Sequence, residues 1–327
     1  MVRMFRRRRA TRPTKIGLAL GSGSARGWAH IGAINALAEA GIRIDCVAGT
    51  SIGALVGAVY ASGRVSSLER VVRELDWKKA MALLDVGLPR SGLFDGRKVT
   101  DSIREHVESG DIQDLPMPFR AVSTNLVNGG EVHIGTGDII DAVRASISIP
   151  GVFTPVKRDG MLLVDGGLVN PVPVSVVREM GADYVIAVDL SYGIPGIGGA
   201  EGANSSGPHD SDDHKRDRAF PSSRLTASME AIKEKVAPLS LPGLAQAKQW
   251  FSRESVPNIL EVLMSSLNVM EKQITDMRLA NEPPDLLIRP NVGHLGLMDF
   301  HRGVEAISEG HRAAKAEVDR TGAEILA

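Results

Sequence analysis

The sequence has a single cysteine, few aromatic residues and no long apolar run. Cys46 is the only cysteine among 327 residues, so no internal disulfide can form, and a reducing compartment is the simplest expectation. Aromatic residues make up only 4% of the chain. No run of about 18 apolar residues occurs, as a membrane-spanning helix would need. The arginines near the start are not followed by the apolar segment that a secretory signal requires.

Charge of either sign is not in excess overall, but its distribution is uneven. The chain has 38 basic and 39 acidic residues and is 43% hydrophobic, as expected for a soluble globular protein. The first fifteen residues carry seven basic side chains, and no acid occurs before Glu39. We expect residues 1–14 to form a disordered basic arm; contact with anionic phospholipid headgroups is the functional alternative. No further basic cluster supports nucleic-acid binding.

Short apolar runs alternate with amphipathic stretches from Lys15 onward. Two strand–loop–helix units are expected first, with strands at 15–20 and 42–48 and helices at 28–40 and 52–61. This alternation predicts a mainly parallel sheet covered on both faces. The later elements that we expect are strands at 119–126, 161–164, 183–189 and 285–288 and helices at 258–280 and about 300–318.

The pattern is interrupted at about residues 191–257, first by a Gly/Ser-rich tract and then by a charged one. We predict an insertion in a single catalytic domain that spans 15–327. Within it, four apolar residues fall on one face of an expected amphipathic helix: Leu225, Met229, Ile232 and Val236. We expect this segment to pack on the protein's own surface; the alternative is that it binds a membrane surface or gates the substrate. Five residues of the tract are of types that commonly bind metal ions: His209, Asp210, Asp212, Asp213 and His214. We nevertheless expect no metal ion there.

A serine lies between two glycines at the junction of an expected strand and an expected helix. The segment Gly49-Thr50-Ser51-Ile52-Gly53 fits the pattern G-x-S-x-G. A nucleophile on such a sharp turn projects its hydroxyl away from the backbone, and the glycines relieve crowding. The following helix presents its positive end to developing negative charge. The alternative is a turn of small residues that only packs the helix against the strand.

A glycine-containing loop at 21–27 (GSGSARG) also follows a strand and opens a helix. Successive backbone amides in such a loop can point into one concavity that suits a phosphate or an oxyanion. A dinucleotide-binding loop is the alternative for Gly21, Gly23 and Gly27, but its spacing is one residue longer than G-x-G-x-x-G. Asp45, the acid at a suitable distance, precedes the end of its strand and would not face a ribose.

A third motif, Asp165-Gly166-Gly167, directly follows the apolar residues 161–164. An aspartate before two glycines is commonly a turn residue. However, a nucleophilic Ser51 needs a base, and the eight histidines of the chain lie in no recognisable triad pattern. A carboxylate at Asp165 can accept the serine proton directly, which would make a two-residue dyad.

Several segments together carry a resemblance to a known family: KIGLALGSGSARGWAHIGAINALAEAGI, GTSIGALVGAVYASG, ASISIPGVFTP (residues 145–155), LLVDGGLVNPVPVSVVREMGADYVIAVDL, DLLIRP and DFHRGVEAI. They resemble the bacterial patatin-like phospholipases, a family that also includes the catalytic domain of neuropathy target esterase. The resemblance covers about residues 15–190 and 258–310, and it leaves the insertion unaccounted for.

The resemblance implies an α/β fold, a three-layer α/β/α sandwich with a mainly parallel central sheet. It implies that Ser51 is the nucleophile and Asp165 the single general base of a Ser–Asp dyad. The residues that it implies for the oxyanion hole are Gly21, Ser22, Gly23, Ser24 and Arg26. Ser22 and Ser24 replace glycines of the family pattern, so a positive φ at either position would be strained.

The activity that the resemblance implies is cleavage of fatty-acyl esters of phospholipids or lysophospholipids through an acyl-enzyme, with no metal and no cofactor. We expect a cytoplasmic enzyme. A peripheral position on the inner face of the membrane, with the basic arm and the insertion contacting anionic lipid, is the functional alternative for these two segments. Two alternatives stay open: an acyltransferase that uses the same acyl-enzyme, and a catalytically idle membrane-binding regulatory module. The oligomeric state also stays open.

Overall fold

The computed structural model describes residues 15–82, 92–94, 104, 110–193 and 259–325. The chain divides into two units, residues 1–198 with 263–327 and residues 199–262. Of the second unit, the structure describes only residues 259–262, the start of a helix. The fold described below is therefore that of the first unit. The basic arm at 1–14 and nearly all of the expected insertion lie outside the described residues.

An eight-stranded mixed sheet forms the centre of this unit, in the order β10-β9-β1-β2-β4-β8-β7, with β5 paired to β4. β10, β9, β1, β2 and β4 are parallel, and β5, β8 and β7 add antiparallel pairs. A separate two-stranded parallel sheet joins β3 and β6. The strands are β1 (Ile16–Leu20), β2 (Cys46–Thr50), β3 (Gly92–Phe94), β4 (Phe119–Asn125), β5 (Glu131–Ile134), β6 (Gly151–Phe153), β7 (Val156–Arg158), β8 (Met161–Asp165), β9 (Tyr184–Val188) and β10 (Leu286–Ile288).

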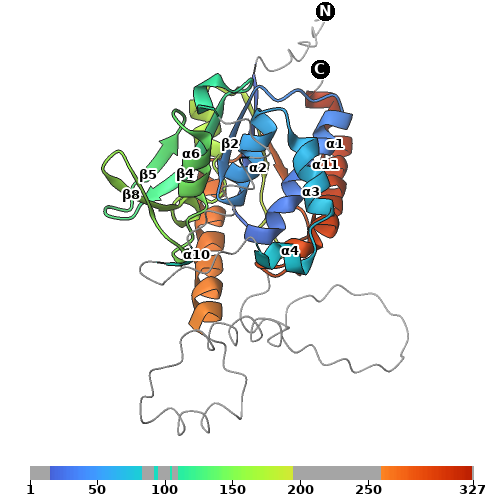
Figure 1. Cartoon of the computed structure of the whole chain (residues 1–327). Coiled ribbons are helices and arrows are strands. Elements are labelled where there is room, and N and C mark those ends of the chain that lie inside the picture. The colour runs from blue at the N-terminus through green and yellow to red at the C-terminus, as the bar shows by residue number, and fades with distance from the viewer. Residues whose placement is uncertain (1–14, 83–91, 95–103, 105–109, 194–258, 326–327) are drawn as a thin grey trace, which may run out of the picture. The chain divides into compact units, whose positions relative to one another are not determined.

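Helices cover both faces of the sheet, as Figure 1 shows. They are α1 (Ala29–Glu39), α2 (Ile52–Ala61), α3 (Val65–Arg73), α4 (Trp77–Ala82), α6 (Ile139–Ser146), α7 (Val174–Glu179), α10 (Ile259–Asn281) and α11 (Gly303–Ile325). Short 3-10 helices are η1 (Ser24–Trp28), η2 (Ile112–Asp114), η3 (Gly166–Leu168) and η4 (Phe300–Arg302). The predicted three-layer α/β sandwich with a mostly parallel sheet is confirmed.

The alternation of side chains along β1 explains the two layers of helices. Leu18 and Leu20 point into a core that contains residues of α1, α2, α6 and α11. Ala19 lies on the other face, with residues of α7 and Leu279 of α10. Cys46 is fully buried in this second core. Because both faces of β1 and β9 are covered, these two strands are apolar along their length rather than alternating.

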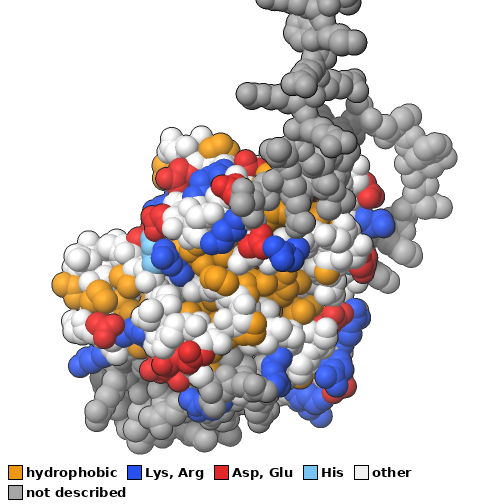
Figure 2. Space-filling view, turned by 90° about the horizontal axis from the view of Figure 1, so that it is seen from above, with side chains coloured by type: hydrophobic (Ala, Val, Ile, Leu, Met, Phe, Trp, Pro, Cys, Tyr) orange, Lys and Arg blue, Asp and Glu red, His pale blue; other side chains and the backbone are white. Residues whose placement is uncertain are grey.

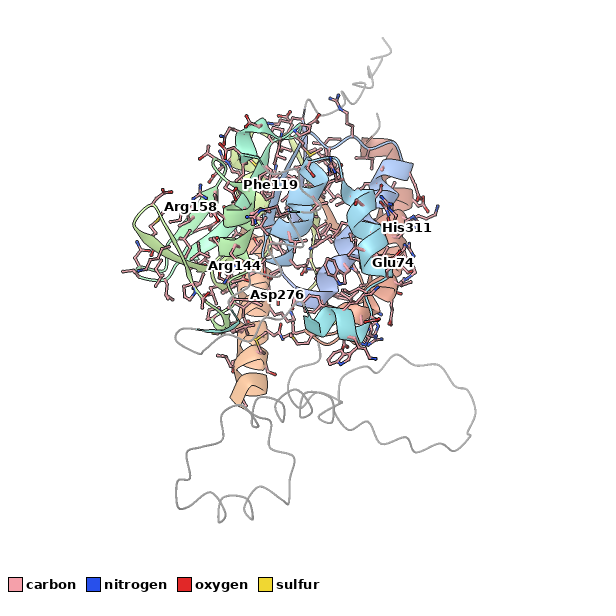
Figure 3. All side chains as sticks on the ribbon, viewed as in Figure 1. Glu74, Phe119, Arg144, Arg158, Asp276 and His311 are labelled. Atoms are coloured by element: carbon pink, nitrogen blue, oxygen red, sulfur yellow. The ribbon has the colours of Figure 1, made fainter. Side chains whose placement is uncertain are left out.

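Glycines bring α1 and α11 together at backbone distance. A Cβ on Gly32 of α1 would collide with the Ile307 carbonyl oxygen of α11, and a Cβ on Gly310 would collide with the Ala29 carbonyl oxygen. On α2, a Cβ on Gly57 would lie 3.2 Å from the Phe119 ring at the start of β4 (Figure 3). Small residues at these positions allow the helices to lie close to each other and to the sheet.

Element positions agree with most of the expected ranges, with two differences. The strand expected at 42–48 begins at Cys46, where pairing with Gly17 of β1 starts. The Asp45 side chain accepts a hydrogen bond from the Ile16 amide (2.9 Å). The last helix continues beyond the expected residue 318 to Ile325. Among the described residues, no helix is long and apolar enough to cross a membrane. The face in Figure 2 mixes acidic and basic side chains around a band of hydrophobic ones.

Candidate active site

Ser51 lies on a sharp turn between β2 and α2. Its backbone has φ 57° and ψ −125°, a conformation that L-residues rarely adopt. A Cβ on Gly49 would collide with the Gly53 carbonyl, and a Cβ on Gly53 would collide with the Leu20 carbonyl. The two flanking glycines are therefore required for the turn to fit against β1. The side chain of Ser51 stands at the N-terminal end of α2, whose dipole favours negative charge there.

The register of the sheet brings Asp165 to this turn. Val122 of β4 pairs with Thr50 at the end of β2, and the next residue, Ser123, pairs with Asp165 at the end of β8. Because β8 is antiparallel to β4, the ends of β2 and β8 meet on opposite sides of β4. Ser51 and Asp165, 114 residues apart in the sequence, thus become neighbours.

The Ser51 hydroxyl donates a hydrogen bond to Oδ2 of Asp165 at 2.5 Å. The other oxygen, Oδ1, accepts a hydrogen bond from the Gly167 amide at 2.8 Å. Asp165 is only 2% exposed, and burial raises its pKa to about 6, although both hydrogen bonds act in the opposite direction. A buried carboxylate that has a raised pKa and accepts a hydrogen bond from the serine hydroxyl is suited to act as a general base.

The amides of the 21–27 loop have different partners. Those of Gly21, Ser22 and Arg26 donate to the carbonyls of Val188 (3.1 Å), Pro171 (2.8 Å) and Gly23 (3.2 Å). No hydrogen bond to a described residue engages the amides of Gly23 and Ser24. Both of these residues line the cavity in front of Ser51. Ser24 has φ 51°, so the strain expected for a serine in this loop occurs at Ser24.

The cavity above the Ser51–Asp165 pair is small and has one apolar side. Its free volume is about 20 Å³, enough for one water molecule. The apolar side chains are Ile149, Met264, Leu267 and Leu297, and Asn268 and Glu271 add polar groups. Four of these six residues belong to α10 (Met264, Leu267, Asn268 and Glu271), so α10 forms one side of the cavity.

The family follows from comparison with known proteins. A model of the patatin-like phospholipase family matches residues 18–178. An uncharacterised NTE family protein of Mycobacterium bovis is 31% identical over 342 residues, which span 94% of this chain and 92% of the relative. The chain belongs to the patatin-like phospholipase family. Membership in this family supports a hydrolase that acts on lipid esters.

Two further similarities are less extensive. Patatin-like phospholipase domain-containing protein 6 of Homo sapiens is 38% identical over 182 residues, which span 54% of this chain and 13% of that protein. The crystal structure of VipD from Legionella pneumophila is similar over 95% of this chain and 67% of VipD, with 13% identity and a TM-score of 0.45. The likeness to VipD is too low to bear on the site.

Two serines of the 145–155 segment hold the backbone of Ser51 and Asp165 in place. The Ser51 amide donates to the Ser146 hydroxyl at 2.9 Å, and this hydroxyl donates to the Val122 carbonyl at 2.5 Å. The Asp165 amide donates to the Ser148 carbonyl at 2.9 Å. The sequence contained a signal for this segment, but it did not indicate that these serines contact the backbone of the expected nucleophile and base.

Arg26, placed by family resemblance in the oxyanion loop, is tied to a C-terminal loop. Its side chain is 5% exposed, and Nε donates to the Leu295 carbonyl at 2.9 Å. Burial lowers the pKa of Arg26, against the effect of the Glu271 and Asp299 charges. The Ser24 hydroxyl donates to the Leu297 carbonyl at 2.7 Å. This loop therefore holds the glycine loop in place rather than leaving Arg26 free to reach Ser51.

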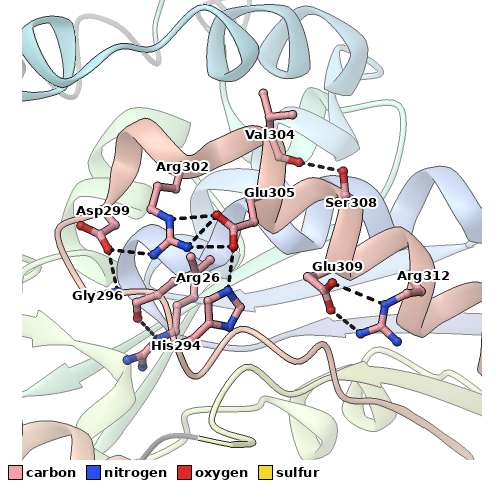
Figure 4. A network of polar contacts seen from close by, with 11 residues as sticks. Arg26, His294, Gly296, Asp299, Arg302, Val304, Glu305, Ser308, Glu309 and Arg312 are labelled. Atoms are coloured by element: carbon pink, nitrogen blue, oxygen red, sulfur yellow. Dashed lines mark hydrogen bonds and ion pairs between the residues drawn. The ribbon is translucent and has the colours of Figure 1, made fainter. Parts of the chain in front are cut away.

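The C-terminal loop is itself braced by charged side chains, shown in Figure 4. Arg302 lies 3.5 Å from Asp299 and donates two hydrogen bonds of 2.8 Å to Glu305. Glu305 also contacts His294 (2.8 Å), and Asp299 accepts from the Gly296 amide (2.9 Å). We infer that this network sets the position of the carbonyls that receive Arg26 and Ser24.

No histidine is among the described residues that line the cavity. His30 is fully buried under the glycine loop, where its Nε2 lies 2.8 Å from the Gly21 carbonyl oxygen. Since a carbonyl only accepts, Nε2 carries the proton, and burial lowers the pKa of His30 to about 4. Asp45, the acid of the dinucleotide alternative, directly precedes β2 and pairs with Arg43 at 2.9 Å.

Glu271 is the residue of the cavity that the sequence did not indicate. It lies near the middle of α10, and its Oε2 accepts a hydrogen bond from the Ser22 hydroxyl at 3.0 Å. No pattern around it distinguishes it from other acids on an amphipathic helix. The metal-like acids and histidines at 209–214 lie outside the described residues, and the described ones contain no cluster of three or more potential metal ligands.

Proposed function

We propose that the protein is a serine lipid acyl hydrolase that cleaves fatty-acyl esters of phospholipids or lysophospholipids. The observation that carries this proposal is the 2.5 Å hydrogen bond from Ser51 to a buried Asp165, on a turn that the backbone adopts only under strain. The apolar lining of the cavity by Ile149, Leu267 and Leu297 suits an acyl chain. Because the cavity holds about one water molecule, α10 must move for an ester to enter.

In the proposed reaction, Ser51 Oγ attacks the ester carbonyl carbon while Asp165 accepts the serine proton. The tetrahedral oxyanion receives hydrogen bonds from the amides of Gly23 and Ser24, with the positive end of α2 nearby. One good donor of this kind lowers the barrier by about 3–4 kcal/mol. The ester C–O bond then breaks, and the leaving alcohol takes the proton from Asp165, which leaves an acyl group on Ser51.

Deacylation follows the same route in reverse. Asp165 accepts a proton from water as the water oxygen attacks the acyl carbon, and Ser51 recovers its proton when the fatty acid leaves. An acyltransferase would replace this water by the hydroxyl of an acceptor and would use the same groups. Hydrolysis is the simpler proposal because it needs no acceptor site.

The test is labelling by a fluorophosphonate, which reacts with activated serines, followed by peptide mass spectrometry. Label confined to Ser51, absent in Ser51→Ala and strongly slowed in Asp165→Asn, is the expected result. Asp276→Asn removes an exposed acid from α10 and serves as the matched control (Figure 3). Absence of label from folded wild-type protein would refute the proposal.

Product analysis with phosphatidylcholine and lysophosphatidylcholine then identifies the reaction. Released fatty acid supports the hydrolase, whereas acyl transfer to an added alcohol without release supports the acyltransferase. If neither occurs but the protein sediments with anionic liposomes in a salt-sensitive manner, the idle membrane-binding module is the better description. The same sedimentation assay with and without residues 1–14 tests the proposed peripheral position at the cytoplasmic membrane surface.

A further inference from the structure

A second carboxyl group, that of Glu271, lies in the same cavity as the dyad. Besides its hydrogen bond from Ser22, it stands directly against η3 at Gly167. A Cβ on Gly167 would collide with Glu271 Oε1 and would lie 3.1 Å from Asp165 Oδ1. The carboxyl groups of Asp165 and Glu271 therefore approach the same point, from β8 and from α10.

The charges around Glu271 do not neutralise it. Arg26 on η1 is the cation that faces it, and its Nε is engaged by the Leu295 carbonyl. On α10 itself, the neighbouring cations pair with other acids: Lys272 with Asp276 (2.6 Å) and Arg278 with Glu131 (2.7 Å). No ion pair joins Glu271 to a described residue.

The other acids near the cavity are also accounted for. Asp189 lines the adjoining hollow on the far side of Glu271 and pairs with Arg289 at 3.1 Å. Asp299 acts on Arg26 from the C-terminal loop. Asp165 is the acid that faces Glu271 across Gly167, so these two carboxyl groups form the coupled pair.

Two carboxylates that share a low-dielectric site do not both ionise at neutral pH. Burial, and then the charge of Asp165, raise the pKa of Glu271 to about 8, against the hydrogen bond from Ser22 and the charge of Arg26. The pKa of Asp165 is raised to about 6. Between these values the pair carries one proton.

We propose that Glu271 is a positioning residue that keeps this proton while Asp165 is ionised. In this form it holds α10 to Ser22 of the glycine loop and leaves one negative charge, that of Asp165, beside Ser51. Loss of the proton places a second negative charge in the cavity where the oxyanion must form, so turnover falls. This inference rests on the proposed function, because it concerns the reactivity of Ser51.

The test is the rate of fluorophosphonate labelling of Ser51 between about pH 5 and about pH 10. The wild-type rate should rise through about pH 6 and fall above about pH 8, and at pH 9.5 it should be roughly 30-fold below its maximum. Glu271→Gln keeps a carbonyl oxygen for Ser22 but cannot ionise, so the alkaline fall should disappear. Asp276→Asn, on the same helix, should keep the complete wild-type profile.

A second variant tests the same limb without removing the Glu271 carboxyl group. Ser22→Ala removes the hydrogen bond that stabilises ionised Glu271, so the alkaline fall should move to higher pH. If either substitution only disturbed the structure, the labelling rate would fall by the same factor at every pH, and the pH values of the rise and the fall would not change. An alkaline limb that is unchanged in both Glu271→Gln and Ser22→Ala would overturn the inference.

A spectroscopic measurement does not depend on Ser51 reactivity. Infrared difference spectroscopy at pH 7 should show the carbonyl stretch of a protonated carboxylic acid in wild type but not in Glu271→Gln. Its absence from wild type would overturn the inference even if Ser51 reacts. Conversely, if the band is present but Ser51 is never labelled at any pH, the proposed function fails and the protonation of Glu271 stands.

Discussion

Replacing Asp165 by asparagine should stabilise the folded protein at neutral pH while it slows the reaction of Ser51. Asp165 is 2% exposed, and burial raises its pKa from 3.8 to about 6. An ionised carboxylate is thus less stable in the folded protein than in the unfolded chain. Asparagine has nearly the same shape but cannot ionise, so it escapes this cost.

The magnitude follows from the pKa difference. A shift of about two units corresponds to about 3 kcal/mol of unfolding free energy. Because the folded state binds the proton more tightly, wild-type stability falls as the pH rises from about 4 to about 6. The asparagine variant lacks this loss, so its advantage over wild type should be small near pH 4 and should reach about 3 kcal/mol above pH 6. Any further widening toward pH 8 belongs to Glu271.

The measurement is urea unfolding of both proteins, followed by tryptophan fluorescence, at several pH values across this window. Taking the difference between variant and wild type cancels groups that both share, such as buried His30 and the ion-paired Glu131. Asp276→Asn makes the same substitution at an exposed position outside the cavity and serves as the control. A gap for Asp165→Asn that stays flat or narrows as the pH rises would refute the assignment of a buried, destabilising carboxylate.

Three further substitutions test the turn, its support and the helix packing. Ser51→Gly should be more stable than Ser51→Ala by about 1–2 kcal/mol in urea unfolding, because glycine adopts a φ of 57° without strain; equal stability would contradict a strained turn. Ser146→Ala leaves two buried backbone groups unpaired and should cost about 1–3 kcal/mol and slow the labelling of Ser51, whereas the exposed Ser308→Ala should change neither. Gly32→Ala should cost at least about 3 kcal/mol, since its methyl group meets the α11 backbone; a fully stable variant would show that α1 and α11 can separate.

Local sequence patterns were sufficient for six of the eight strands of the central sheet, but β5 and β7 were not expected. The glycine after residue 40 and the small residues of 52–61 predicted helices that the structure contains at α1 and α2. The turn chemistry around Ser51 and Asp165 also marked both residues before any contact was known. What brings them together is the pairing of β4 with β2 and β8, and an antiparallel strand at that position was not predictable from the sequence.

The remainder depends on contacts between distant segments. The amides of Gly21 and Ser22 donate hydrogen bonds to β9 and to the turn at Pro171, whereas those of Gly23 and Ser24 donate none to a described residue. This difference depends on where β9 and that turn lie in the fold. Glu271 is one acid among several on α10, and its environment arises only when α10 lies against η3. The expected roles of residues 1–14 and of the amphipathic insertion stay predictions, because these residues lie outside the described part of the chain.

The cavity is built from two separate stretches of the sequence. Ser51 and Asp165 lie within residues 18–178, which match the family model, whereas Met264, Leu267, Asn268 and Glu271 on α10 lie beyond it. The proposed nucleophile and base thus come from one stretch of the chain and much of the apolar side of the cavity from another. We therefore expect that substitutions at Met264 and Leu267 can reshape the space for an ester without disturbing the turn that carries Ser51.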